Sequence, residues 1–325
     1  MDVKSETPIR KLDLVGRIQS QASLGTLVAL CVIASFCFPE FPRQLNLTNI
    51  VRQISMTGLV SIGMTFVILS GGIDLSVGST AAAASVLAAR LSREFGLMAV
   101  GAPILLGIFI GAVNGMLITR ARIPPFIATL AMMLGARGLA FILAGGEPVG
   151  ADPSSWLYQI AKTDLLGFPC LGIIFLLTLG VAIVVARYTG FGRSLYAIGG
   201  NEEAAVMMGL NVNHKKMLVY MICGGLAGAA GMLLTSRINS GQPTAAAGWE
   251  LTAIAAVVIG GTSLTGGRGK MGHTLYGVLI LGVISNVINL EGTLSYWYAN
   301  LITGVLLLAV VLLQSRIAGG RIRDT

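Results

Sequence analysis

The sequence predicts an all-α membrane protein of about ten transmembrane helices, and composition and the spacing of its apolar runs both indicate this class. Apolar residues make up 54% of the 325-residue chain and charged residues only 11%, whereas a soluble domain carries about 25% charged residues. The 22 Lys and Arg against 14 Asp and Glu leave a formal charge of +8. Because these charges fall between long apolar runs, they fit loops facing lipid headgroups and cytosol rather than a nucleic-acid surface. A soluble enzyme, a disordered chain and a disulfide scaffold are excluded.

The spans follow from the length of the apolar runs, since a helix needs about 20 apolar residues to cross a bilayer core. They are expected at 22–38, 53–70, 75–91, 98–118, 126–144, 171–187, 217–235, 250–263, 272–290 and 297–314. The third and the eighth are short and rich in glycine, and the eighth fits a re-entrant half-helix as well as a full crossing. Residues 22–314 therefore form the predicted transmembrane domain.

The distribution of Lys and Arg predicts the orientation of these spans. Ten spans place both termini on one side, and the segments on that side hold 15 Lys and Arg, against six on the other. The positive-inside rule therefore predicts an N-in, C-in protein, with a cytoplasmic N-terminal segment at 1–21, a cytoplasmic loop at 188–216 and a cytoplasmic tail at 315–325. The outer segment at 145–170 is long enough to dock a partner or to cap an opening.

Two Gly-Gly sequences interrupt the apolar runs. Gly71-Gly72 precedes Asp74 and Ser76, whose side-chain oxygens can cap the helix that follows. Gly260-Gly261 repeats the pattern Gly-Gly-x-x-Leu-Ser/Thr-x-Gly at an offset of 189 residues. Each sequence fits a capped tight turn, but each also fits a broken helix that lines or gates a pathway, because unwound backbone at membrane depth needs protein or water around it.

Other residues within the apolar runs also have two interpretations. Asn114, Asn286 and Asn289 can hydrogen-bond a polyol in a pathway, or they can bond neighbouring helices. Glycines spaced by four residues allow helix backbones to touch, and packing is a simpler role for them than gating. These glycines are Gly107, Gly111, Gly115, Gly224 and Gly228.

The cytoplasmic loop has the pattern of a short helix. It has an Asn cap, an acidic first turn, a run of Ala and Met, and a terminal glycine. A helix that presents Ala, Val and Met to the cytosol exposes an apolar patch, and such patches mark partner sites. The residues singled out are Gly200, Asn201, Glu202, Glu203, Ala204, Ala205 and Gly209.

Enzymatic and cofactor motifs are scarce. Gly269-Lys270 lacks both the glycine five positions earlier and the following Ser or Thr of a phosphate-binding loop. Two isolated His and four Cys without metal-ligand spacing provide no metal site and no nucleophile–base pair. We therefore expect no cofactor on this chain. An ion-coupled secondary sugar carrier is the alternative function, although Arg137 is the only clearly ionisable residue deep in a span.

Three segments resemble the permease subunits of bacterial ribose-type ABC sugar importers, a family that includes ribose, xylose, arabinose, galactose and autoinducer-2 permeases. They are Gly-Ile-Asp-Leu-Ser-Val-Gly-Ser at 72–79, Tyr-Ala-Ile-Gly-Gly-Asn-Glu-Glu-Ala-Ala at 196–205, and Ala-Ile-Ala-Ala-Val-Val-Ile-Gly-Gly-Thr-Ser-Leu-Thr-Gly-Gly-Arg-Gly at 253–269. The likeness runs from about residue 45 to 314. It implies a multi-pass permease of the bacterial inner membrane, which translocates a monosaccharide or similar polyol.

The resemblance also implies the partners. They are a second permease copy or a sister permease, a periplasmic sugar-binding protein that hands over the substrate, and a cytosolic ABC ATPase with two fused cassettes. ATP and Mg would bind to that ATPase, and this chain would hydrolyse no ATP. By the same likeness, the segment 200–209 is the coupling helix that seats in a groove of the ATPase.

Overall fold

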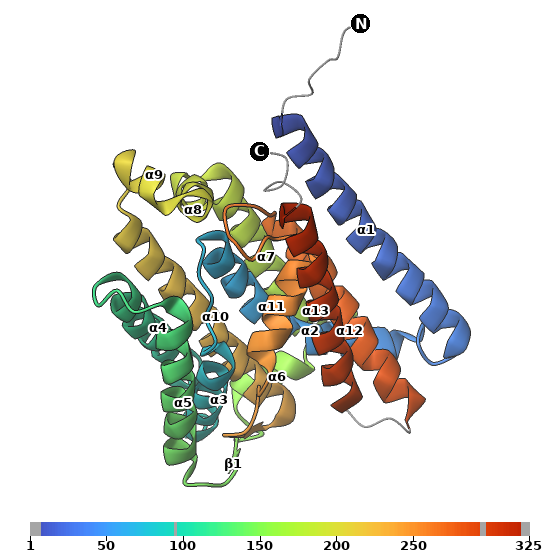
Figure 1. Cartoon of the computed structure of the whole chain (residues 1–325). Helices are drawn as coiled ribbons and strands as arrows, with labels where there is room; N and C mark the ends of the chain where they lie inside the picture. The colour runs from blue at the N-terminus through green and yellow to red at the C-terminus, as the bar shows by residue number, and fades with distance from the viewer. Residues whose placement is uncertain (1–7, 94–95, 293–296, 320–325) are drawn as a thin grey trace, which may run out of the picture.

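A computed structural model of the protein describes residues 8–93, 96–292 and 297–319, and these residues form a bundle of helices (Figure 1). The longer helices are α1 (Pro8–Cys37), α2 (Gln44–Leu69), α4 (Met98–Thr119), α5 (Pro125–Ala144), α7 (Cys170–Tyr188), α10 (Val212–Ile238), α12 (Thr274–Glu291) and α13 (Trp297–Gly319). The shorter ones are α3 (Val77–Leu91), α6 (Trp156–Lys162), α8 (Gly190–Gly200), α9 (Glu202–Met207) and α11 (Trp249–Ile259). Of the predicted terminal segments, residues 1–7 and 320–325 lie outside the described residues.

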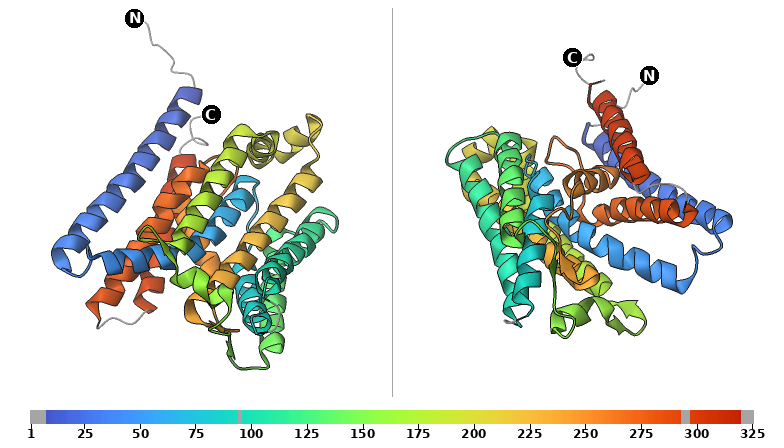
Figure 2. Two further views of the ribbon diagram at one scale, coloured as in Figure 1. Left: turned by 180° about the vertical axis from the view of Figure 1, so that it is seen from behind. Right: turned by 90° about the horizontal axis from the view of Figure 1, so that it is seen from below.

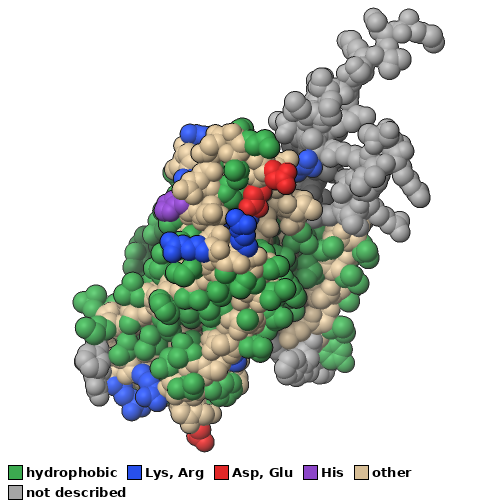
Figure 3. All heavy atoms as spheres, turned by 60° about the vertical axis from the view of Figure 1, so that its left-hand side comes forward, with side chains coloured by type: hydrophobic (Ala, Val, Ile, Leu, Met, Phe, Trp, Pro, Cys, Tyr) green, Lys and Arg blue, Asp and Glu red, His purple; other side chains and the backbone are tan. Residues whose placement is uncertain are grey.

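The predicted helical membrane class is confirmed. In the described part of the chain, six segments are long and apolar enough to cross a membrane: Gln44–Leu69, Met98–Thr119, Pro125–Ala144, Cys170–Tyr188, Val212–Ile238 and Met271–Glu291. Shorter apolar stretches lie at Ser23–Cys37, Val77–Leu91, Trp249–Ile259 and Tyr298–Leu312. In Figure 3, hydrophobic side chains form a broad band over the surface, and charged side chains gather at its two ends. This distribution is typical of a protein surrounded by lipid.

Two predicted boundaries differ from the structure. Helix α1 begins at Pro8, so much of the segment 1–21 continues the first predicted span as one helix along the edge of the bundle (Figure 2). Helix α11 has only 11 residues, which rise about 16 Å, whereas the bilayer core is about 30 Å thick. Helix α11 alone is therefore shorter than the core, which fits the half-helix alternative for the predicted span 250–263.

Helices α4 and α10 pack with their backbones in contact. A Cβ atom added at Gly107 would overlap the carbonyl oxygen of Gly224, and one added at Gly224 would overlap the carbonyl oxygen of Gly107. One turn further along, a Cβ atom at Gly111 would overlap the carbonyl oxygen of Tyr220. The packing role expected for these glycines is confirmed, because no side chain fits between the two helices.

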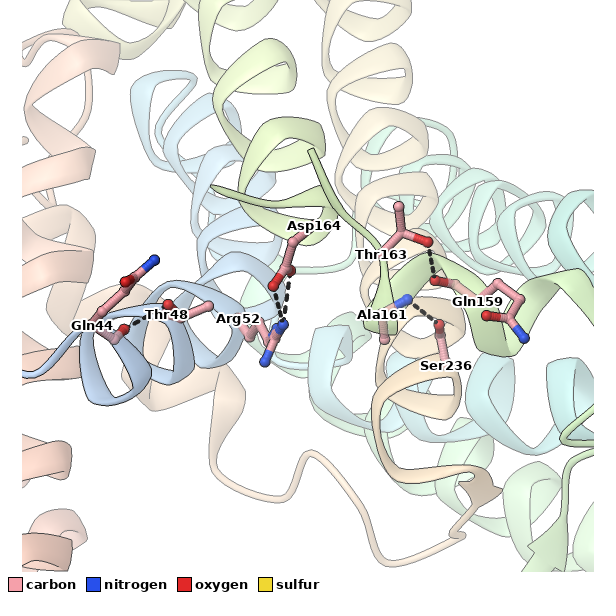
Figure 4. A network of polar contacts seen from close by, with 8 residues as sticks. All are labelled: Gln44, Thr48, Arg52, Gln159, Ala161, Thr163, Asp164 and Ser236. Carbon is pink, nitrogen blue, oxygen red and sulfur yellow. Dashed lines mark hydrogen bonds and ion pairs between the residues drawn. The ribbon is translucent and has the colours of Figure 1, made fainter. Parts of the chain in front are cut away.

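The segment predicted on the outer side folds across the end of the bundle opposite α8 and α9 (Figures 1 and 2). Its strand β1 (Val149–Gly150) pairs antiparallel with β4 (Ser240–Gly241), and β2 (Asp164–Leu165) pairs with β3 (Phe168–Pro169). Figure 4 shows how side chains fasten it to the bundle. Arg52 Nη2 on α2 donates to both carboxylate oxygens of Asp164, at 2.7 and 2.9 Å, and Ser236 Oγ on α10 accepts from the Ala161 N–H at 3.0 Å.

The contact between α4 and α10 yields a stability prediction. Gly107→Ala should destabilise the protein by roughly 1–3 kcal/mol, the usual cost of overpacking a closely packed site. The matched control is Gly101→Ala on the same helix, where an added Cβ meets nothing within 4 Å. There the better helix propensity of alanine should leave stability unchanged or raised. Thermal unfolding of the detergent-solubilised protein measures both, and equal midpoints would contradict the packing role.

Candidate functional site

Helices α8 and α9 lie together at one end of the bundle (Figure 1). The Thr189 hydroxyl caps α8 by accepting from the Gly192 N–H at 3.2 Å. The Asn201 side chain caps α9 by accepting from the Ala204 N–H at 2.9 Å. Gly209 follows α9 with a left-handed φ of 80°, which glycine adopts without strain. The short helix predicted in the segment 200–209, with its Asn cap and its glycine end, is confirmed.

Three consecutive apolar side chains at the end of α9 and just after it are exposed. The exposed side chains are Val206 at 57%, Met207 at 86% and Met208 at 67%. Ala205 is instead fully buried, in a small cluster with Ile198 of α8 and Val212 of α10. The expectation that Ala205 presents its side chain to the cytosol is therefore wrong. The alanine seats α9 on the protein, and the two methionines with Val206 form its outer surface.

An ion pair joins α9 to α10. Lys216 Nζ lies 2.6 Å from Glu202 Oε2, and the Lys216 side chain is the more buried of the two. Glu203 is exposed and has no ion-pair partner among the described residues. An exposed pair of this kind contributes little to stability, about 0–1 kcal/mol. The pair is therefore a weak attachment between α9 and α10, and the Glu203 carboxylate stays exposed.

Three segments, one of them the end of α8, meet at a point that we call the glycine junction. This junction is formed by Gly71, Gly199, Gly266 and Gly267. The Gly267 N–H donates to the carbonyl oxygen of Leu69, the last residue of α2, at 3.0 Å. A Cβ at Gly266 would lie 2.9 Å from Gly71 Cα and 3.1 Å from Gly199 Cα. The end of α2, the end of α8 and the loop after α11 therefore touch through their backbones. Two of the three segments that carry the family resemblance meet here, and the third begins at Gly72, directly after Gly71.

A tyrosine adds a second attachment between α8 and the loop after α11. The Tyr196 hydroxyl donates to the Gly269 carbonyl oxygen at 3.2 Å. Burial raises the pKa of the Tyr196 phenol above its ordinary value, so the hydroxyl remains a donor at any physiological pH. Helix α8 is thus held to this loop by its glycines and by a side chain.

Both Gly-Gly sequences end helices in the same way. Gly71 and Gly261 have left-handed φ values of 81° and 92°. In each turn the glycine N–H donates to the carbonyl three residues back, and the next N–H donates to the carbonyl five residues back, at 2.9–3.1 Å. Gly71 therefore corresponds to Gly261, whereas the sequence repeat aligns it with Gly260. The backbone does not follow the repeat in its predicted register.

The polar residues after the first turn bond one another. The Ser76 N–H and hydroxyl both donate to Asp74 Oδ1, at 2.9 and 2.6 Å, and Asn114 Nδ2 donates to the Ser76 hydroxyl at 2.9 Å. All three residues are buried. Ser76 makes no capping bond to α3, so its predicted capping role is wrong. Its hydroxyl instead joins Asp74 to Asn114, and this network fastens the break between α2 and α3 to α4.

The other predicted pathway residues are engaged in packing or lie on the surface. Asn286 on α12 and Asn46 on α2 exchange two amide hydrogen bonds, at 2.7 and 3.0 Å, which is the interhelical alternative. A Cβ at Gly260 would lie 2.6 Å from the His273 carbonyl oxygen. Asn289 is exposed.

A cavity of about 170 Å³ lies among α2, α10, α11, α12 and α13. None of the predicted pathway residues lines it. Its polar lining includes Gln53, Thr57, Trp249, Ser285 and Asn300. Sequence reasoning missed these residues because most of the lining helices contribute only one or two polar side chains, which form no local pattern.

Comparison with known proteins finds relatives that are named as permeases of sugar transport systems. The chain is 41% identical to the ribose import permease protein RbsC of Bacillus subtilis (strain 168), over 96% of this chain and 97% of that protein. It is 43% identical to the ribose import permease protein RbsC of Escherichia coli (strain K12), over 92% and 94%. The L-arabinose transport system permease protein AraH of the same strain is 38% identical, over 91% of each chain. No solved structure matches.

A family model described as "Branched-chain amino acid transport system / permease component" matches residues 46–311. This range contains the glycine junction, α8, α9 and the lining of the cavity. By the extent of this match and by the identity to its relatives, the chain belongs to that family of transport-system permeases.

Proposed function

We propose that this chain is the membrane permease subunit of an ATP-driven ABC importer for a monosaccharide, located in a bacterial inner membrane. The relatives named for ribose and L-arabinose import support the substrate class. One observation carries the mechanism: α9, which leads to the exposed apolar side chains, follows directly on α8. The end of α8 contacts the end of α2 and the loop after α11 at the glycine junction. A partner that binds α9 would therefore act on the two broken regions of the bundle.

The partners are a cytosolic ABC ATPase of two fused cassettes, which binds ATP and Mg, and a periplasmic binding protein, which delivers the sugar. A second permease copy or a sister permease would complete the membrane part. We assign the ATPase contact to Val206, Met207 and Met208, with Glu203 available to basic groups of the ATPase. The apolar side chains supply most of the affinity because they leave water on docking, and the acidic group mainly sets orientation.

The same proposal places ten apolar helices in the membrane with both termini in the cytoplasm, of which α3 and α11 are the shortest. The segment 145–170 then faces the periplasm, and α8 and α9 face the cytosol. The distribution of Lys and Arg supports this orientation, as does the separation of these two regions at opposite ends of the bundle (Figure 1).

Orientation is tested with single cysteines in a background whose four native cysteines are replaced by alanine. Ser154 and His214 are both exposed. His214 lies in the first turn of α10, and Ser154 lies in the segment 145–170 at the opposite end of the bundle. We expect Ser154→Cys to react with an impermeant thiol reagent in intact spheroplasts, and His214→Cys to react only after the membrane is opened. Labelling of His214→Cys from the periplasm would invert the orientation.

The α9 contact is tested by Met207→Asp in the complex with the ATPase. Because docking would bury this side chain, the substitution should reduce co-purification of the ATPase by roughly tenfold or more, as expected for about 1.5–3 kcal/mol of apolar burial. ATP-driven ribose uptake by proteoliposomes should fall with it. Ala205→Asp is the wrong probe, since it would place a charge inside the protein's own core.

The matched control is Leu166→Asp, at a fully exposed apolar residue on the opposite end of the bundle. It should leave co-purification of the ATPase near wild type, because in the proposed orientation Leu166 lies on the periplasmic side. Normal uptake by Met207→Asp would remove α9 from the mechanism. Uptake by the chain alone, driven by an ion gradient without ATP, would instead support a secondary carrier.

The glycine junction is tested by two adjacent substitutions. A Cβ at Gly199 would overlap the Leu69 carbonyl oxygen, whereas a Cβ at Gly200 meets nothing within 4 Å. Gly199→Ala should therefore separate α8 from the junction at a cost of roughly 1–3 kcal/mol, and ribose uptake should fall severalfold while the ATPase still co-purifies. Gly200→Ala should transport normally. Equal uptake by the two variants would show that the junction has no part in coupling.

A further inference from the structure

The cavity among α2, α10, α11, α12 and α13 has the lining of a polyol site. Gln53, Ser285 and Asn300 contribute polar side chains that make no side-chain hydrogen bond within the described part of the chain. Their amides and hydroxyl are therefore available to a ligand as donors and acceptors. Trp249 adds a broad apolar surface beside them. A few polar groups around an apolar wall is the usual composition of a small-molecule site.

Three threonines of the lining already use their hydroxyl hydrogens in hydrogen bonds to the backbone, so they can offer a ligand only acceptors. The hydroxyls of Thr57, Thr252 and Thr303 each donate to a carbonyl of their own helix, at 3.3, 3.0 and 2.8 Å. Their lone pairs remain free to accept, so they suit the hydroxyl groups of a ligand. A sugar hydroxyl both donates and accepts, and it can satisfy threonines of this kind together with the free amides.

Charge distinguishes a sugar from an amino acid at this site. The lining has one cation, Arg237, and no Asp or Glu. The Glu250 carboxylate, next to Trp249 in sequence, accepts instead from the Gly248 N–H at 3.2 Å. A zwitterionic amino acid would bring an ammonium group with no carboxylate to pair with, which is costly in a desolvated site. A neutral polyol carries no such cost.

The cavity lies toward the end of the bundle that carries the segment 145–170. Gln53 and Arg237 of the lining directly adjoin Arg52 and Ser236, the residues that fasten this segment to α2 and α10 (Figure 4). In the proposed orientation this is the periplasmic half of the membrane. Its volume of about 170 Å³ is below the roughly 300–1,000 Å³ of sites for drug-sized ligands, so it suits a single monosaccharide.

We propose that this cavity is the site at which the permease holds one neutral monosaccharide after the binding protein releases it, with Gln53, Ser285 and Asn300 bonding its hydroxyls and Trp249 covering an apolar face of the ring. The assignment rests on the proposed import of sugars. It differs from the sequence-based candidates, because Asp74, Ser76, Asn114 and Asn286 bond other parts of the protein.

The test uses the full complex of permease, ATPase and binding protein in proteoliposomes, with D-ribose as the probe. Gln53→Leu and Asn300→Leu keep side-chain size but remove hydrogen bonding. Each should lower ATP-driven ribose uptake by roughly threefold to tenfold, the equivalent of one hydrogen bond, and the double variant should lower it further. ATPase co-purification and thermal stability should stay at wild-type values. Thr178→Val on α7, a half-buried polar position that does not line the cavity, should transport normally.

A second measurement does not depend on removing a side chain. Ser285→Cys should lose uptake when treated with a small thiol reagent, and excess ribose delivered by the binding protein should slow that loss. The wild-type complex treated in the same way corrects for the four native cysteines. Unchanged ribose uptake by the leucine variants, or labelling of Ser285→Cys without effect on uptake, would overturn the cavity assignment. Failure of the wild-type complex to transport any monosaccharide while it transports leucine would instead overturn the proposed function.

Discussion

Contact between backbones at glycine is the constraint on which the architecture depends. In lipid there is no hydrophobic force between helices, so close packing and internal hydrogen bonding must hold the bundle together. Contacts of this kind occur between α4 and α10 and at the glycine junction, where the Gly267 N–H bonds the Leu69 carbonyl. The same contacts allow helices to end inside the protein, because every freed backbone group must find a partner there.

This constraint also arranges the functional parts. The end of α2 contacts the end of α8, and α8 leads directly into α9. The exposed methionines lie at the end of α9 and just after it. Toward the other end of the bundle, α2 and α11 contribute Gln53 and Trp249 to the polar cavity. A displacement of α9 by a partner would therefore reach both helices that connect the junction to the cavity. The interior is too closely packed to absorb such a displacement by gradual deformation.

Local rules in the sequence predicted local structure well. The apolar runs located the helices, and the Asn201 cap and the Gly209 end of α9 were confirmed because both act within a few residues of the chain. Long-range packing was beyond those rules. Whether Ala205 faces the cytosol depends on Ile198 and Val212, and whether Asn286 is free depends on Asn46, 240 residues away. The cavity was missed for the same reason, since its lining comes from five helices.

The half-helix α11 has a consequence for how the protein is made. A segment of 11 residues is too short to enter lipid by itself as it leaves the translocation machinery. The turns that lead into it are held by Arg137 of α5, whose guanidinium donates to the carbonyl oxygens of Pro243 and Ala245 at 2.6 and 2.8 Å. Arg137, which anchors this stretch, is therefore synthesised about a hundred residues before the stretch itself. This contact can form only after α5 is in place, so the order of synthesis makes the anchor available before the stretch that it holds.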